Sequence, residues 1–331
     1  MDSGVRGDGD GRFPAGPREP PEPPDPLGPF THLALLYRDE REYLDGVLPF
    51  VRGALAAGEP VIVAVPAERL RLIQDEFGTD PAPRLVDMRV AGRNPGRIIP
   101  GVLRAFADTQ PPGAQVRIVG EPMWAERTAV EYAACVQHEA LVNLSFEGRR
   151  ATVLCPYDIR ALAPQAVADV HATHPMILDA GSGRARDSDS YAPDAALARY
   201  NEPLPPVPDV LALAFDAEAL GETRHLATDE GARLGLPSAR LPDLALAIAE
   251  LTTNSVVHGG GSGALRLWAE DGFVVCEVRD KGHLTDPLAG RRPAPRARRG
   301  GRGLLLVNLL ADLVRLHTGP GGTTVRCWFR R

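Results

Sequence analysis

The sequence predicts two α/β domains, an N-terminal domain built on a parallel sheet and a C-terminal α/β sandwich. Three observations lead to this prediction. The chain has 331 residues, which is more than one hydrophobic core usually organises. Short apolar runs alternate with longer helical patterns in its first half, whereas a long amphipathic helix precedes alternating strands in its second half. A polar, proline-rich stretch separates the two halves.

The composition narrows the classes of protein to consider. Apolar residues make up 44% of the chain and charged residues 24%, which is typical of globular proteins. The net charge of −6 provides no global basic field, so we expect no direct contact with nucleic acid. No run of 18 uncharged apolar residues occurs, so we expect no membrane span. The four cysteines form no C-x-x-C pair, which favours buried thiols in a reducing cytoplasm over a disulfide framework or a zinc site.

Two segments of biased composition set the domain boundaries. Residues 1–28 contain seven prolines and six glycines with almost no large apolar side chain, so we expect a disordered tail. Residues 181–205 are polar and become proline-rich towards their end, which is typical of a linker. These segments leave an N-terminal domain at 29–180 and a C-terminal domain at 206–331.

The N-terminal domain has a regular rhythm of strand and helix. Four strands are predicted, at 32–37, 61–65, 115–119 and 151–156, and 85–90 is predicted as an additional strand. Helices are predicted after them at 40–57, 67–77, 127–144 and 159–171. The rhythm indicates a parallel sheet covered by helices, which normally binds ligand at the carboxyl ends of its strands. Because the domain has no G-x-x-x-x-G-K-[S/T] loop, we expect no nucleotide hydrolysis there.

Motifs in this domain resemble those of the MEDS family, a bacterial sensory module. The matching features are His32 in the first strand, the segment 37–43, the strand that follows Gly58, Cys155-Pro-Tyr-Asp158 and His174-Pro175. The resemblance implies an α/β domain that detects an unknown small-molecule signal. His32 and His174 are candidates to line a sensing pocket, and the alternative is that each histidine is simply packed or solvated.

The C-terminal domain is marked by a strong helix pattern at 241–258, preceded by a helix at 217–234. Pro242 suits the first turn of the later helix, and glycines follow its last turn. Its core stripe recurs at helical spacing and comprises Leu244, Ile248, Leu251 and Ser255. Glu250 and Asn254 are four residues apart and therefore share an adjacent face.

The pair of Glu250 and Asn254 suits phosphoryl transfer. An asparagine oxygen is a neutral ligand for Mg²⁺, and a glutamate can orient or deprotonate an attacking hydroxyl. The alternative is an ordinary solvated helix face, on which this spacing is common.

A β-hairpin follows, with strands predicted at 263–269 and 273–278 around an Asp-Gly turn. Beyond its second strand lie Asp280 and Gly282. Asp280 is placed to accept a hydrogen bond from an adenine amino group, while Gly282 lets the backbone pass close to the base. An ordinary Asp-x-Gly turn is the alternative.

Two glycine-rich segments complete the pattern. Gly301, Arg302 and Gly303 open an apolar helix, and free N–H groups at a helix start bind phosphate. A last strand starts at Gly321, where the hydroxyl of Thr323 or Thr324 can reach a nucleotide or satisfy a turn.

The order of these motifs resembles the N, G1, G2 and G3 boxes of the GHKL superfamily, which has the Bergerat fold. The resemblance implies ATP and Mg²⁺ as cofactors, with Glu250 as catalytic base and Asn254 as the Mg²⁺ ligand. It further implies adenine contacts from Asp280 and Gly282, phosphate contacts from Gly301–Gly303 and a supporting contact from Thr323. The segment 283–299 would be the ATP lid, whose arginines are Arg291, Arg292, Arg296, Arg298 and Arg299. His283 and Leu284 depart from the glycine or alanine that commonly extends the G1 box.

Within the superfamily, this compact domain looks like the anti-sigma regulatory factors. That resemblance implies a serine/threonine protein kinase whose partner is an anti-anti-sigma (STAS) protein, with a sigma factor as a further partner and a homodimer as the expected assembly. One alternative is a non-catalytic module that binds nucleotide or a partner. A soluble sensor histidine kinase is the other, but it would need a phosphoacceptor, and His225 lacks the expected His-Glu context.

Overall fold

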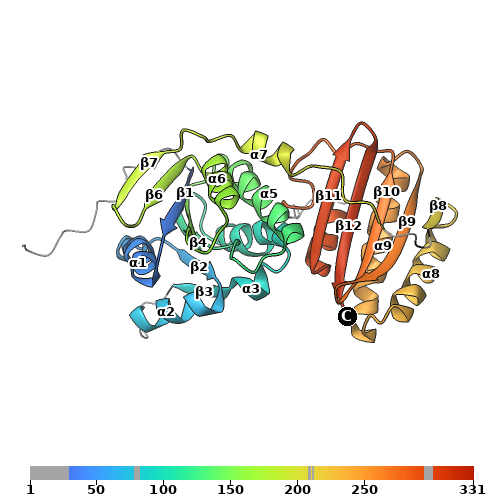
Figure 1. Cartoon of the computed structure of the whole chain (residues 1–331), viewed down its shortest axis with the longest axis horizontal. Helices are drawn as coiled ribbons and strands as arrows, with labels where there is room; N and C mark the ends of the chain where they lie inside the picture. Colours follow the sequence, from blue (N-terminus) through green and yellow to red (C-terminus); the bar gives the residue numbers. More distant parts are fainter. Residues whose placement is uncertain (1–29, 78–82, 208–209, 211, 294–300) are drawn as a thin grey trace, which may run out of the picture.

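The computed structural model describes residues 30–77, 83–207, 210, 212–293 and 301–331, so the predicted tail at 1–28 lies outside the described residues. The described chain forms two sheets, each with its own layers of helices, which lie side by side in Figure 1. One sheet contains parallel strands and the other is antiparallel, which confirms the predicted fold class. No described helix is long and apolar enough to cross a membrane.

The N-terminal sheet has seven strands in the order β3-β2-β4-β5-β1-β6-β7. Their bounds are β1 Phe30–Tyr37, β2 Val61–Val65, β3 Arg84–Asp87, β4 Val116–Gly120, β5 Ala151–Asp158, β6 Met176–Asp179 and β7 Arg184–Asp187. All neighbours are parallel except β6 and β7, which form an antiparallel pair. The sheet is therefore parallel, as expected, with one reversed strand at its edge.

Helices cover both faces of this sheet because its central strands carry apolar side chains on both faces. Leu33 and Leu35 of β1 pack against α1 and α2, whereas Ala34 and Leu36 face the opposite layer. The helices of the first layer are α1 Glu40–Ala56 and α2 Ala67–Phe77. Those of the second layer are α3 Met88–Ala91, η1 Pro95–Arg97, η2 Ile99–Leu103, α4 Arg104–Ala107, α5 Ala129–Ser145, α6 Pro164–Thr173 and α7 Pro193–Arg199.

Four parts of this domain differ from the sequence prediction, one of which is β6, where no strand was predicted. The strand expected at 85–90 ends at Asp87, because the Asp87 carboxylate accepts a hydrogen bond from Arg89 N at 2.9 Å and caps α3. The segment 95–107, for which no element was predicted, is a series of short helical turns. The segment predicted as a loose linker contains β7 and α7, since the backbone of β7 pairs with β6.

The C-terminal sheet has five antiparallel strands in the order β11-β12-β10-β9-β8. Their bounds are β8 Ala212–Asp216, β9 Ser262–Glu270, β10 Phe273–Asp280, β11 Leu313–Gly319 and β12 Gly322–Arg330. The predicted Asp-Gly turn joins β9 and β10, with positive φ at Asp271 and Gly272. Neither β8 nor β11 was predicted.

One face of this sheet packs on helices and forms the core of the domain. The helices are α8 Leu220–Arg233, η3 Ser238–Arg240, α9 Leu241–His258 and α10 Gly303–Leu310. The opposite face turns towards the N-terminal domain, where Ala134 of α5 packs on Trp268, Val275, Leu313 and Trp328. Arg315 of β11 adds two hydrogen bonds to this contact between the domains, to Val130 O at 3.0 Å and to Tyr200 O at 3.2 Å.

Candidate functional site

Helix α9 presents Glu250 and Asn254 at the margin of the C-terminal core. The predicted stripe of Leu244, Ile248, Leu251 and Ser255 is buried, with exposures of 2% or less. Glu250 and Asn254 are half-buried on the adjacent face. The helix therefore holds a carboxylate and an amide beside the core while both stay accessible to a ligand.

The start of α10 lies directly against these two side chains. A Cβ added to Gly303 would lie 2.7 Å from Glu250 Oε2 and 3.1 Å from Asn254 Nδ2. A side chain at position 303 would therefore displace Glu250 or Asn254, and glycine lets the start of α10 lie close to both of them. The structure thus brings together motifs that lie about 50 residues apart in the sequence.

Asp280 ends β10, and its carboxylate is held from two sides. Ser255 Oγ donates to Asp280 Oδ2 at 2.7 Å, and the backbone N–H of Gly282 donates to Oδ1 at 2.8 Å. A Cβ at Gly259 would lie 2.4 Å from Asp280 Cγ, so the end of α9 also needs a glycine. Ser255 was predicted only as part of the core stripe, and its contact with Asp280 was not predicted.

Thr323 lies opposite Asp280 in the pairing of β12 with β10. Its hydroxyl donates to Gly282 O at 2.9 Å and lies 2.9 Å from the Thr318 hydroxyl. Thr318 also accepts from Leu284 N at 2.9 Å and so anchors the start of the predicted lid. Thr318 was missed because β11 was not predicted, although the Pro-Gly-Gly turn after it could have signalled a hairpin.

Glu250, Asn254, Asp280, Gly282, Gly303 and Thr323, hereafter the motif site, thus cluster around the ends of α9 and β10 and the start of α10. Gly301 and Arg302 lie just before α10, and both are exposed. Gly301 has φ of +75°, a conformation that suits glycine.

The described part of the predicted lid, 283–293, contacts the N-terminal domain. Leu288 is 2% exposed and belongs to the apolar cluster of that domain. Arg292 pairs with Asp286 at 2.5 Å. Burial, together with the nearby charge of Arg315, lowers the pKa of Arg291 to about 10. The other three arginines, Arg296, Arg298 and Arg299, lie outside the described residues.

A cavity of about 280 Å³ lies beside this lid segment, between the two domains. Its walls include Gln137 of α5, Leu197 of α7, Leu284 and Arg291 of the lid segment, and Thr318 of β11. The same cavity therefore borders the N-terminal domain and the threonine that supports the motif site.

The N-terminal domain buries polar groups both inside its core and at the carboxyl ends of its strands. His32 and His174 do not line an open pocket, because both are 0% exposed, with ring centroids 4.1 Å apart. Tyr37, at the end of β1, donates its hydroxyl to Glu121 Oε1 at 3.3 Å. Burial raises the pKa of Glu121 to about 8, so this carboxyl is protonated at neutral pH.

Family models match a segment in each half of the chain. Residues 31–175 match the family of the MEDS (MEthanogen/methylotroph, DcmR Sensory) domain. Residues 213–329 match the histidine kinase-like ATPase domain.

Two individual proteins each resemble part of the chain. Serine-protein kinase RsbW of Halalkalibacterium halodurans is 29% identical over 117 residues, which cover 32% of this chain and 72% of that protein. A solved structure of the RsbU and RsbW domains of Rv1364c from Mycobacterium tuberculosis is 24% identical and covers 38% of this chain. The match spans only 33% of that chain, and its TM-score of 0.27 is too low to support an inference. These matches confirm the predicted resemblances, since one part of the chain is similar to the MEDS domain and another to the histidine kinase-like ATPase domain, and the chain also resembles a serine-protein kinase.

Proposed function

We propose that this protein is an ATP-dependent serine/threonine protein kinase of the anti-sigma type, controlled by its N-terminal sensory domain. The observation that carries the proposal is the contact of the α10 start with Glu250 and Asn254, where a Cβ on Gly303 would meet both side chains. Phosphoryl transfer depends on positioning and charge stabilisation, and a carboxylate and an amide that lie against the start of a helix support this role.

The residues of the motif site fit a nucleotide. Asp280 is fixed by Ser255 and the Gly282 amide, so its remaining acceptor capacity suits the amino group of adenine. Thr323 supports the same turn through Gly282 O. The α10 start, approached through Gly301, Arg302 and Gly303, would bind the phosphates.

The donor set also fits Mg²⁺, because Asn254 offers a neutral oxygen beside the phosphate position and Glu250 lies one helical turn away. Asn254 would hold the ion, which neutralises phosphate charge when it is bound. Glu250 would orient the acceptor hydroxyl and accept its proton. The half-buried position of Glu250 leaves room for a protein serine or threonine to approach.

The relative named serine-protein kinase supports a protein substrate. We propose an anti-anti-sigma (STAS) protein as that substrate and a sigma factor as a second binding partner, with a cytoplasmic homodimer as the working assembly. The sensory domain would exert its control through the lid segment. Asn308 of α10 links the two, since it donates to Gly290 O at 3.1 Å and its own carbonyl accepts from Asn94 Nδ2 at 2.8 Å.

The test uses the full chain with Mg²⁺ and labelled ATP, and STAS proteins of the source cell as acceptors. Glu250→Gln should bind ATP within about threefold of the wild type, because the change keeps the shape of the side chain. Phosphate transfer should fall by at least about 100-fold, because the general base is lost. Glu222→Gln, an exposed position on α8, is the matched control and should transfer normally.

Three outcomes would overturn parts of the proposal. Absence of saturable ATP binding by the wild type would remove the nucleotide site. Binding without transfer to any STAS protein would favour the non-catalytic module. Label on the protein itself that disappears in His225→Gln would favour the histidine kinase.

A further inference from the structure

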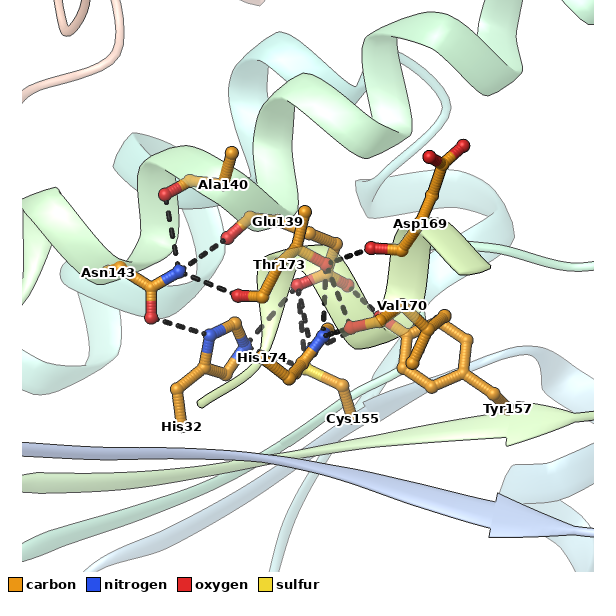
Figure 2. Close-up of polar contacts among 10 residues, drawn as sticks. All are labelled: His32, Glu139, Ala140, Asn143, Cys155, Tyr157, Asp169, Val170, Thr173 and His174. Atoms are coloured by element: carbon orange, nitrogen blue, oxygen red, sulfur yellow. Dashed lines mark hydrogen bonds and ion pairs between the residues drawn. The ribbon is translucent and has the colours of Figure 1, made fainter. Parts of the chain in front are cut away.

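Four side chains with metal-binding atoms converge in the core of the N-terminal domain. They are His32 of β1, Glu139 of α5, Cys155 of β5 and His174 just after α6. Figure 2 shows them pointing towards one another between the sheet and the helices above it. Their potential ligand atoms all lie within 4.8 Å of one another, and all four residues are buried. We call this group the histidine cluster.

Four of the six distances between the ligand atoms of the histidine cluster match the edges of a tetrahedron around a metal ion, and the other two lie within 4.8 Å. His32 Nε2 lies 3.4 Å from Glu139 Oε2 and 3.4 Å from Cys155 Sγ. Glu139 Oε2 lies 3.6 Å from His174 Nε2 and 3.7 Å from Cys155 Sγ. A tetrahedral zinc ion with bonds of about 2.0–2.3 Å separates its ligands by roughly 3.3–3.7 Å. The four measured edges therefore need little adjustment to receive an ion.

Outer partners turn the inner nitrogen of each histidine towards the cluster. His174 Nδ1 lies 2.9 Å from Val170 O, and a carbonyl can only accept, so Nδ1 carries the hydrogen. His32 Nδ1 lies 3.1 Å from Asn143 Oδ1. The Asn143 amide is oriented because Nδ2 donates to three carbonyls, the nearest being Thr173 O at 2.8 Å. Both Nε2 atoms thus keep a free lone pair, as in histidines that bind metals.

The carboxylate of Glu139 is oriented in the same way. Tyr157 OH donates to Glu139 Oε1 at 2.6 Å, which leaves Oε2 facing His32, Cys155 and His174. Two imidazole lone pairs and a carboxylate oxygen, all acceptors, therefore converge on one thiol. Without a cation, such a buried arrangement is costly because negative charge and lone pairs face one another.

We propose that the histidine cluster is a binding site for a divalent transition metal ion, with zinc as the best fit. Two imidazoles, a thiolate and a carboxylate are borderline donors that suit zinc rather than Mg²⁺ or Ca²⁺. Four protein ligands close the coordination sphere, which is the arrangement of a structural ion. The absence of a C-x-x-C pair favoured buried thiols over zinc, whereas these ligands come from separate elements that only the fold brings together.

The ion would link α5 to the sheet, because Glu139 of α5 would bind the same ion as His32 of β1 and Cys155 of β5. Glu139 lies on the buried side of α5, and Ala134 of the same helix packs on the ATPase domain through Trp268 and Trp328. Occupancy of the histidine cluster would therefore set the position of the helix that joins the two domains.

The test measures metal uptake by the nucleotide-free full chain. Protein stripped with a chelator and then exposed to zinc should retain one equivalent after gel filtration. Cobalt in place of zinc should give the intense visible bands of a tetrahedral site and a thiolate charge-transfer band in the near ultraviolet. A folded wild-type chain that retains neither ion would overturn the proposal, whatever the variants do.

Two cysteine variants assign the site. Cys155→Ser should abolish the charge-transfer band and weaken cobalt binding by at least about 100-fold. Cys135→Ser is the matched control, because Cys135 is also 0% exposed in the same core but its thiol donates to Pro122 O instead. A band that persists in Cys155→Ser, or that disappears equally in Cys135→Ser, would contradict the assignment.

Discussion

The motif site and the histidine cluster place ionisable groups in opposite environments. Glu250 and Asn254 are half-buried at the margin of a core, where solvent and ligand can reach them. The four side chains of the histidine cluster are between 0% and 3% exposed and depend on one another. The first site is completed by a ligand that arrives from solution, whereas the second must be satisfied from within the protein.

Because of this difference, mutations at the two sites should change different properties of the protein. A polar group in the core contributes to folding, because its loss leaves partners buried without hydrogen bonds. A half-exposed group at a ligand site contributes mainly to binding and chemistry, since water replaces its lost contacts. Substitutions of buried polar residues in the N-terminal domain should therefore change stability, and those in the motif site should change activity.

The largest effect is expected at Asp169, a buried carboxylate outside the histidine cluster. It is 1% exposed and accepts hydrogen bonds from Tyr132, Tyr200, Gln165 and Arg199. Asp169→Ala should lower the free energy of unfolding of the N-terminal domain by about 3–5 kcal/mol, because these donors lose their shared acceptor. Hydrogen exchange of peptides from β1 and β5 provides the measurement.

Glu250→Ala is the comparison for Asp169→Ala, and it should change the stability of its own domain by no more than about 0.5 kcal/mol. If the two variants lost similar free energies of unfolding, the buried and the half-exposed carboxylate would contribute equally to stability, and the contrast between the two environments would be wrong.

A smaller effect is expected from pH, through Glu121. Its pKa is raised to about 8, chiefly by burial, with the charge of Arg69 opposing the rise and Glu68 and Asp158 adding to it. Between pH 5 and 7 an unfolded chain releases this proton, whereas the folded chain keeps it. The free energy of unfolding should therefore fall as the pH rises, by up to about 1.4 kcal/mol per unit or about 2.7 kcal/mol over this range.

Glu121→Gln should flatten this slope, because the amide keeps the size of the side chain and does not titrate. Glu147→Gln, an exposed change in the same domain, is the control and should keep the wild-type slope. Urea unfolding at each pH measures both variants. An unchanged slope in Glu121→Gln would assign the pH dependence to another group.

The sequence predicted most of the strands and helices because their apolar residues recur with a clear period. Both ends of α2 and of α9 agree with the prediction. A proline marks the start of each helix and glycines follow α9, while α2 ends where its periodic apolar pattern stops. The short turns at 95–107 escaped prediction because they are held by tertiary contacts, such as the hydrogen bond from Asn94 Nδ2 to Asn308 O. Strand β11 was missed because its apolar alternation is short and interrupted by Arg315, a residue that the other domain buries.

The candidate sites show the same contrast. The residues of the motif site could be proposed from sequence because each carries a local motif and the motifs occur in a fixed order. Ser255 and Thr318 could not, because their roles arise only where α9, β10 and β11 meet. The histidine cluster was seen only as two separate histidines and a cysteine. Glu139 completes it from α5 and Asn143 of the same helix orients His32, and no local pattern links either residue to His32.

The smallest effect tests the motif site with a single methyl group. In Gly303→Ala the new Cβ would lie 2.7 Å from Glu250 Oε2, so the carboxylate must move. The far end of a glutamate moves easily, so stability should hardly change, while misplacement of Glu250 and Asn254 should slow phosphate transfer about tenfold, or about 1.4 kcal/mol. Gly221→Ala is the matched control, because its added Cβ on α8 would meet no atom within 4 Å. If Gly303→Ala transferred phosphate as fast as Gly221→Ala, the close contact of α10 with Glu250 would have no part in the chemistry.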